Sequence, residues 1–270
     1  MAKSIRNFFI DADADQADEI KQAVEKEGAV ILRKIISTER ANNLKVALLK
    51  ALDEDNKKYG DDYLFNGMVH ALMSRGIEFI ELLEQPEILA IFRAILGHGC
   101  IVHAYNSSSM PPNKTNFSRS IHVDCPRLIP GYITNLGINI AIDPFTNENG
   151  AMEIFPDSFT MASAPGEELF NKEKIILNDL QAGDAILFNA RCWHRGGVNT
   201  TTQWRHSISA NICRAYMRQQ FDYPAMLGDS KIQTFSDDIK QLIGYNVRMP
   251  ANMEEFLLPA DKRKYKAGQE

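Results

Sequence analysis

The sequence of 270 residues has few cysteines, no excess of basic residues and no long apolar run. Its 4 cysteines show no Cys-x-x-Cys spacing, which is typical of reduced thiols and argues against a disulfide framework. The 30 Lys and Arg residues against 35 Asp and Glu residues give a formal net charge of −5, which argues against a nucleic-acid-binding protein. No stretch approaches the roughly 18 apolar residues of a membrane span, and the first residues lack the apolar segment of a signal peptide. We therefore expect a cytoplasmic protein that binds neither nucleic acid nor a membrane.

Hydrophobic spacing divides the chain into three parts. Residues 1–100 are predicted to be mostly helical, with helices at 13–27, 41–52 and 86–96 and a short buried strand at 28–32. Residues 101–215 carry short β-rich runs between Pro, Gly and Asn clusters, a pattern typical of a sandwich or barrel. These runs are 101–110, 120–123, 134–142, 151–155, 185–188 and 207–213. Residues 216–270 look polar and irregular, with a charged end at 262–270, so we expect one domain consisting of a helical support, a β core and a C-terminal extension.

A candidate metal site begins at His122 and Asp124, which are two residues apart. On a strand, side chains at this spacing point to the same face, so both can approach one ion. His194, at the end of a later β-rich run, offers a third donor. Two imidazoles and one carboxylate are the ligands that leave open positions on non-haem Fe(II). A His-x-Asp tripeptide is common by chance, and a lone histidine in a β protein is more often structural, so the triad is a hypothesis at this stage.

The run from Gln203 to Asn211 places a polar file on one strand face. Arg205 heads this file, and Ser207, Ser209 and Asn211 follow it at every second position. A buried guanidinium needs an anion, so a file that lines a ligand cavity would let Arg205 bind a carboxylate with support from Ser207. The alternative is a sheet face in solvent with an ordinary surface arginine.

At these residues the sequence resembles the phytanoyl-CoA dioxygenase family of Fe(II)/2-oxoglutarate-dependent oxygenases. The resemblance covers about residues 100–215 and rests on His122-x-Asp124, the run Glu148–Phe159, Gly183-Asp184, and Trp193-His194 followed by Arg205 and Ser207. The second segment of the family usually ends in Pro-Gly-Ser-His, whereas Asp157 and Phe159 stand here in place of the glycine and the histidine. The resemblance implies a mainly β fold with flanking α-helices, built on a double-stranded β-helix (jelly-roll, cupin-like) core.

The resemblance also implies roles for individual residues. His122, Asp124 and His194 would bind Fe(II), and Arg205 with Ser207 would hold the distal carboxylate of the cosubstrate 2-oxoglutarate. Two further contacts to the cosubstrate are implied at Asn139 and Asn106. Related halogenases have a small residue at the carboxylate position, so the presence of Asp124 favours oxygenation.

The expected reaction is the hydroxylation by O₂ of an unactivated C–H bond, with release of succinate and CO₂ and stimulation by ascorbate. The expected substrate is a polar small molecule from natural-product or amino-acid metabolism. Arg127, Arg191, Asn66 and Asn189 are candidate substrate contacts because they lie near the presumed mouth of the site. Arg127 and Arg191 follow and precede proposed ligands by three residues, which makes them the better candidates for an anionic or hydroxyl-bearing substrate.

Two other functions remain open from the sequence. The same cofactors also support desaturation, epimerisation or ring closure. Alternatively, the chain is a non-catalytic cupin-like binding or scaffold protein whose triad is vestigial or holds structural zinc. Cys192 is then a candidate fourth ligand, because it lies two residues before His194. The sequence is compatible with a monomer or a homodimer.

Overall fold

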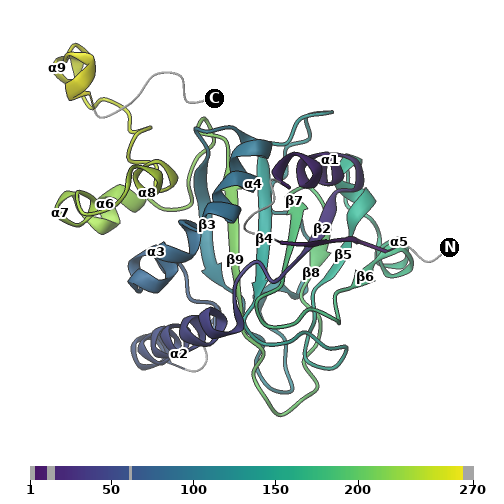
Figure 1. The fold of residues 1–270 in the computed structure, drawn as a ribbon. Coiled ribbons are helices and arrows are strands. Elements are labelled where there is room, and N and C mark those ends of the chain that lie inside the picture. The colour runs from purple at the N-terminus through teal and green to yellow at the C-terminus, as the bar shows by residue number, and fades with distance from the viewer. Residues whose placement is uncertain (1–3, 11–15, 61–62, 264–270) are drawn as a thin grey trace.

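The computed structural model describes residues 4–10, 16–60 and 63–263, and the strands among them form two sheets (Figure 1). The larger sheet has the order β1 (Arg6–Phe9), β2 (Ala29–Arg33), β7 (Ala185–Asn189), β4 (Asn135–Ala141), β9 (Ser207–Cys213) and β3 (Ile101–Ser107). The smaller sheet has the order β6 (Ile175–Ile176), β5 (Glu153–Phe155) and β8 (Trp193–Arg195). β1 pairs with β2 in parallel, and the remaining strand pairs are antiparallel.

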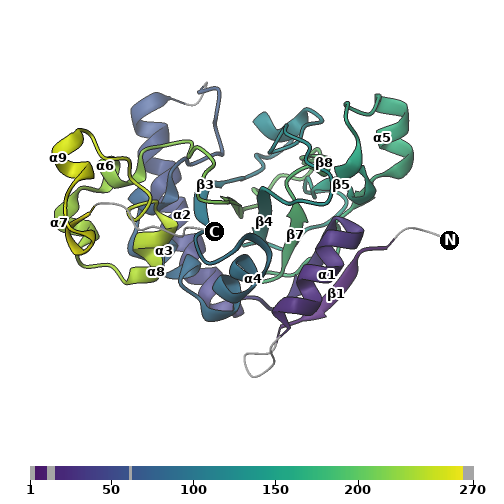
Figure 2. The same cartoon turned by 90° about the horizontal axis from the view of Figure 1, so that it is seen from above.

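Helices from the first hundred residues cover one face of the larger sheet (Figures 1 and 2). They are α1 (Ala17–Glu27), α2 (Thr38–Tyr59), the short 3₁₀ helix η1 (Leu72–Ser74), α3 (Ile77–Leu83) and α4 (Pro86–Leu96). Two helix starts are stabilised locally: the Ser37 side chain accepts a hydrogen bond from the N–H of Arg40 at the start of α2, and Pro86 occupies the first turn of α4. α1 ends at Gly28, whose φ of 80° is a left-handed conformation that glycine adopts without a steric penalty.

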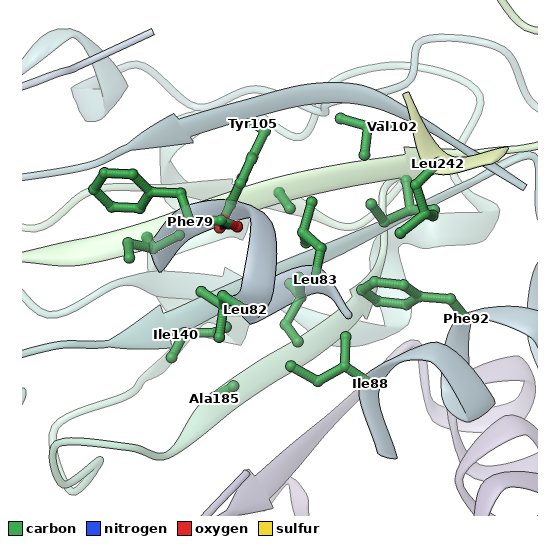
Figure 3. Close-up of a cluster of buried hydrophobic side chains, with 14 of the residues drawn as sticks. Phe79, Leu82, Leu83, Ile88, Phe92, Val102, Tyr105, Ile140, Ala185 and Leu242 are labelled. Atoms are coloured by element: carbon green, nitrogen blue, oxygen red, sulfur yellow. Dashed lines mark hydrogen bonds between the residues drawn. The ribbon is translucent and has the colours of Figure 1, made fainter. Parts of the chain in front are cut away.

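The main apolar core lies between these helices and the larger sheet (Figure 3). It joins residues of α3 and α4 to residues of the strands, namely Phe79, Leu82, Leu83, Ile88, Phe92, Val102, Tyr105, Ile140 and Ala185. The fully buried Tyr105 keeps its hydroxyl satisfied by donating to the carbonyl of Phe79 at 2.9 Å. This core fixes which face of the larger sheet is turned away from the helices.

A second apolar cluster lies between the two sheets. Ile31, Ile186 and Phe188 of the larger sheet contribute to it together with Ile154 of β5. Each strand that contributes to both clusters sends alternate side chains to opposite faces. The predicted mainly β core with flanking helices is therefore confirmed.

The structure corrects several local predictions. Residues 120–123 form no regular strand; they follow the 3₁₀ helix η2 (Phe117–Arg119), and His122 alone makes a single bridge to His194. β1 and α3 were not predicted. The helix predicted over 13–27 is α1, which begins at Ala17. Residues 13–15 of the predicted range lie outside the described part of the chain.

The C-terminal extension is also more ordered than predicted. It contains α6 (Tyr223–Leu227), α7 (Asp229–Ile232), α8 (Asp237–Leu242), α9 (Met253–Phe256) and the 3₁₀ helix η4 (Ala260–Lys262). Tyr223, Ile232 and Ile239 are buried in the main core, which holds this segment against the rest of the molecule. Most of the predicted charged end, residues 264–270, lies outside the described residues. Among the residues that the structure describes, no helix combines the length and apolar composition that a membrane crossing requires.

Candidate metal centre

Three side chains from two separate segments of the chain converge in one cavity. Potential ligand atoms of His122, Asp124 and His194 all lie within 4.8 Å of one another. The Asp124 Oδ1 atom is 3.6 Å from His122 Nε2 and 3.7 Å from His194 Nε2. Reciprocal backbone hydrogen bonds of 3.0 Å between His122 and His194 place the two imidazoles side by side.

A hydrogen bond at Nδ1 orients each imidazole. His122 Nδ1 donates to the carbonyl of Ser120 at 2.7 Å, and His194 Nδ1 donates to the carbonyl of Cys192 at 3.0 Å. Since a carbonyl only accepts, each Nδ1 carries a proton, which leaves each Nε2 as the ring atom that can bind a metal ion. Burial lowers the pKa of His194 to about 4, so its imidazole is neutral near pH 7.

This donor set fits ferrous iron. Two imidazole nitrogens and one carboxylate match the facial triad of non-haem Fe(II) oxygenases. No fourth protein donor joins the group within the described residues. The Cys192 thiol donates to the carbonyls of Gly28 and Pro156, and burial raises its pKa. The geometry therefore does not match a four-ligand structural zinc site that includes Cys192.

Arg205 lies in the wall of the same cavity, and its side chain is almost fully buried. Its Nη1 donates to the carbonyl of Ser108 at 3.0 Å and to Ser207 Oγ at 2.9 Å, and its Nη2 donates to the carbonyl of Gly150 at 2.7 Å. The guanidinium also lies 4.3 Å from the centre of the Phe145 ring.

This cation has no ion-pair partner among the described residues, and its Nε–H is buried without an acceptor. Burial lowers the pKa of Arg205 to about 10, which reflects the energetic cost of an uncompensated charge. An anion that entered the cavity would remove that cost, so the residues fit the carboxylate of 2-oxoglutarate. The predicted polar face thus lines a cavity and is not a solvent-exposed surface.

The cavity that contains the triad and Arg205 has a volume of about 250 Å³. Asn106, Asn139, Ser209 and Asn211 line it from β3, β4 and β9. Asn139 lies opposite Ser209 in the β4–β9 pairing, and its Oδ1 is buried without a partner. Asn106 and Asn139 are thus in the cavity, whereas Ser207 contacts the cavity only through Arg205.

The four predicted substrate contacts lie elsewhere. Asn189 and Arg191 line a separate pocket of about 310 Å³ beside residues 128–133, and Asn66 and Arg127 do not line the metal cavity. The reason for Asn189 is strand alternation: Phe188 faces the metal cavity, so the next residue faces the side covered by α1. Arg191 is turned toward backbone carbonyls of the loop that follows Asp124.

Sequence reasoning missed other lining residues. His103, Ser118 and Gln220 all contribute to the metal cavity. Gln220 comes from the C-terminal extension, which runs back along the edge strand β3 because the N–H of Gln220 donates to the carbonyl of His103 at 2.8 Å. No local motif marks these residues, and only the tertiary contact brings them to the site.

The chain matches the family model for phytanoyl-CoA dioxygenase (PhyH) over residues 24–207. Uncharacterized protein Rv1501 of Mycobacterium tuberculosis is 33% identical over 208 residues, which are 75% of this chain and 76% of the relative. Dioxygenase ALT11 of Alternaria alternata is 25% identical over 256 residues, 86% of this chain and 83% of the relative.

A solved structure of EctD from S. alaskensis with 2-oxoglutarate and 5-hydroxyectoine is 17% identical, with a TM-score of 0.62. The similarity covers 76% of this chain and 78% of that one, and it supports the predicted jelly-roll fold. The family match spans about two thirds of the chain and includes the predicted ligand segments and Arg205. The chain therefore belongs to the phytanoyl-CoA dioxygenase family.

Proposed function

We propose that this protein is a non-haem Fe(II) oxygenase that uses 2-oxoglutarate and O₂ to hydroxylate an unactivated C–H bond of a neutral polar small molecule. Family membership and the dioxygenase relatives support the coarser statement that it is a non-haem oxygenase. The observation that carries the finer proposal is the presence of the triad and an unpaired buried Arg205 in one cavity.

Different residues of the cavity would bind the metal and the cosubstrate. His122, Asp124 and His194 would hold the metal, because their potential donor atoms all lie within 4.8 Å of one another. Arg205 would orient 2-oxoglutarate by pairing with its distal carboxylate, while Ser207 holds the guanidinium in place. When bound, iron and 2-oxoglutarate supply an O₂-derived oxidant and release succinate and CO₂.

The walls around the triad and Arg205 indicate a neutral substrate. Asn106, Ser118 and Gln220 offer uncharged hydrogen-bonding groups, and His103 adds an imidazole. The remaining charged residue at the cavity, Arg195, is already bound by Glu153 at 2.7 Å and by Glu167 at 3.1 Å. Hydroxyl or amide groups would be recognised here, and a long fatty acyl chain would leave these polar groups unpaired.

Asp124 would supply the carboxylate ligand and therefore favours oxygenation, most commonly hydroxylation, over halogenation. The EctD structure contains 2-oxoglutarate and 5-hydroxyectoine, a hydroxylated compound, which supports the same reaction class for this fold. Product mass distinguishes the outcomes, because hydroxylation adds one oxygen whereas desaturation or ring closure removes two hydrogens.

The test has two steps. Under anaerobic conditions, the protein with Fe(II) and 2-oxoglutarate should develop a weak visible charge-transfer band that Asp124→Ala lacks. In air, a screen of neutral polar metabolites with Fe(II), 2-oxoglutarate and ascorbate should identify compounds that increase succinate release. Absence of the band in the wild type, or succinate release at the wild-type rate in Asp124→Ala, would refute the proposal.

A further inference from the structure

The proposed ligand Asp124 lies in a bend outside the regular strands. Its backbone is held by the carbonyl of Ala190, which accepts from the N–H of Asp124 at 3.0 Å and from the N–H of Cys125 at 3.1 Å. The two histidine ligands, in contrast, fix each other through their reciprocal backbone bonds. The position of the carboxylate therefore depends on what holds the residues that follow it.

Arg191 contacts those residues directly. Its side chain is buried, and Nη1 donates to the carbonyl of Pro126 at 2.9 Å and to that of Cys125 at 3.4 Å. Nη2 donates to the carbonyl of Met161, just beyond the 3₁₀ helix η3 (Pro156–Thr160). No carboxylate of the described part of the chain pairs with this guanidinium. The Arg191 guanidinium therefore links two separate segments by donating hydrogen bonds to their backbone carbonyls.

Arg191 is itself held firmly in place. Its N–H donates to Asn189 Oδ1 at 3.0 Å, and the N–H of Asn189 donates to the carbonyl of Gly28 at 2.8 Å. Two residues further on, the N–H of Trp193 donates to Ser158 Oγ at 2.8 Å, and His194 follows. The connection between β7 and β8 therefore leads directly to one ligand, His194 of β8, and its Arg191 holds the loop that follows another ligand, Asp124.

We propose that Arg191 is a positioning residue for the metal centre, which fixes the loop after Asp124 so that its carboxylate meets the two imidazoles. This inference rests on the proposed function of the triad. It replaces the predicted substrate contact, because the guanidinium faces the carbonyls of residues 125, 126 and 161 and not the metal cavity.

The geometry requires arginine at this position. A guanidinium carries five N–H groups in one plane and can serve three carbonyls at once, whereas a lysine ammonium is a single point on a flexible stem. Arg191→Lys therefore keeps the charge but loses part of the connection between the segments. Arg191→Met keeps the apolar stem and loses all of the donors.

The experiment is a titration of the metal-free protein with Co(II), followed by the visible absorption bands of the bound ion. Residues that orient metal ligands typically change metal affinity by about 10- to 100-fold, so Arg191→Met should weaken Co(II) binding by that amount. Its absorption bands should also change in position or intensity, because Asp124 no longer approaches in the same geometry. Arg191→Lys should have a Co(II) affinity between those of the wild type and Arg191→Met.

Arg127→Met is the matched control, since Arg127 lies exposed on the same loop and forms none of these bonds. It should bind Co(II) within about two-fold of the wild type, as expected for a surface substitution. Urea unfolding identifies which variants fold cooperatively. If Arg191→Met does not fold, Arg191→Lys decides the question.

A folded Arg191 variant with wild-type Co(II) affinity and spectrum would overturn the inference while leaving the proposed function intact. If the wild type binds no Co(II), or if Asp124→Ala binds Co(II) as tightly as the wild type, then the triad itself is wrong and both proposals fail.

Discussion

Arg205 gives the most direct prediction about the cosubstrate. It is 2% exposed, its Nε–H has no partner, and no acidic residue of the described chain forms an ion pair with it. Replacing Arg205 by Met would remove a buried charge-assisted pair with 2-oxoglutarate, a change worth about 2–5 kcal/mol. Since about 1.4 kcal/mol corresponds to a tenfold change in Kd, the Kd for 2-oxoglutarate should rise by about 30-fold to several thousand-fold.

The assay is an anaerobic titration of the Fe(II)-loaded protein with 2-oxoglutarate, followed by the visible charge-transfer band. Arg205→Lys keeps the charge without the planar fork and should show a smaller loss than Arg205→Met. Co(II) affinity measured without 2-oxoglutarate should stay unchanged in both variants, because Arg205 is not one of the three donors. A Kd for 2-oxoglutarate within about three-fold of the wild type in Arg205→Met would refute the assigned role.

Three further predictions concern the metal and the stability of the fold. Asp124→Ala should lose Co(II) binding and succinate formation together, because two imidazoles alone remain; retention of either activity would contradict the triad. Burial lowers the pKa of His206 to about 4, below its ordinary 6.5, so the unfolded chain binds the extra proton. The free energy of unfolding should therefore fall by up to about 3 kcal/mol as pH decreases from about 6.5 to 4, and His206→Gln should flatten this dependence in urea titrations. In Gly137→Ala the new Cβ would lie 2.3 Å from the Phe188 ring, so urea unfolding should show a loss of about 1–3 kcal/mol, and an unchanged midpoint would contradict this packing.

Strand alternation made much of the site predictable. The polar file from Arg205 to Asn211 was expected on one strand face, and Arg205, Ser209 and Asn211 do line the cavity. The intervening residues Ile208 and Ala210 lie in the core under the helices. This prediction succeeded because a period of two is a property of the local backbone, which the sequence displays directly.

Residues placed by tertiary contacts were not predictable in the same way. The C-terminal helices have only four to six residues, too few for a helical hydrophobic pattern or for stability in isolation. Gln220 reaches the cavity only because its segment pairs with the edge of β3. Asp124 was expected on a strand beside His122, but it lies in a bend whose shape depends on Ala190 and Arg191.

The register between β4 and β9 links the apolar core to the chemistry of the site. Asn139 lies opposite Ser209, and Ile138 lies opposite Ala210. A shift of one residue in β9 would turn Ser209 toward the helices and Ala210 toward the cavity. Such a shift would bury polar groups without partners and expose apolar side chains to the polar cavity, and both changes are unfavourable. Packing of the isoleucines of β4 and β9 against α3 and α4 therefore selects the register of β9. In this register the polar file that begins at Arg205 faces the cavity.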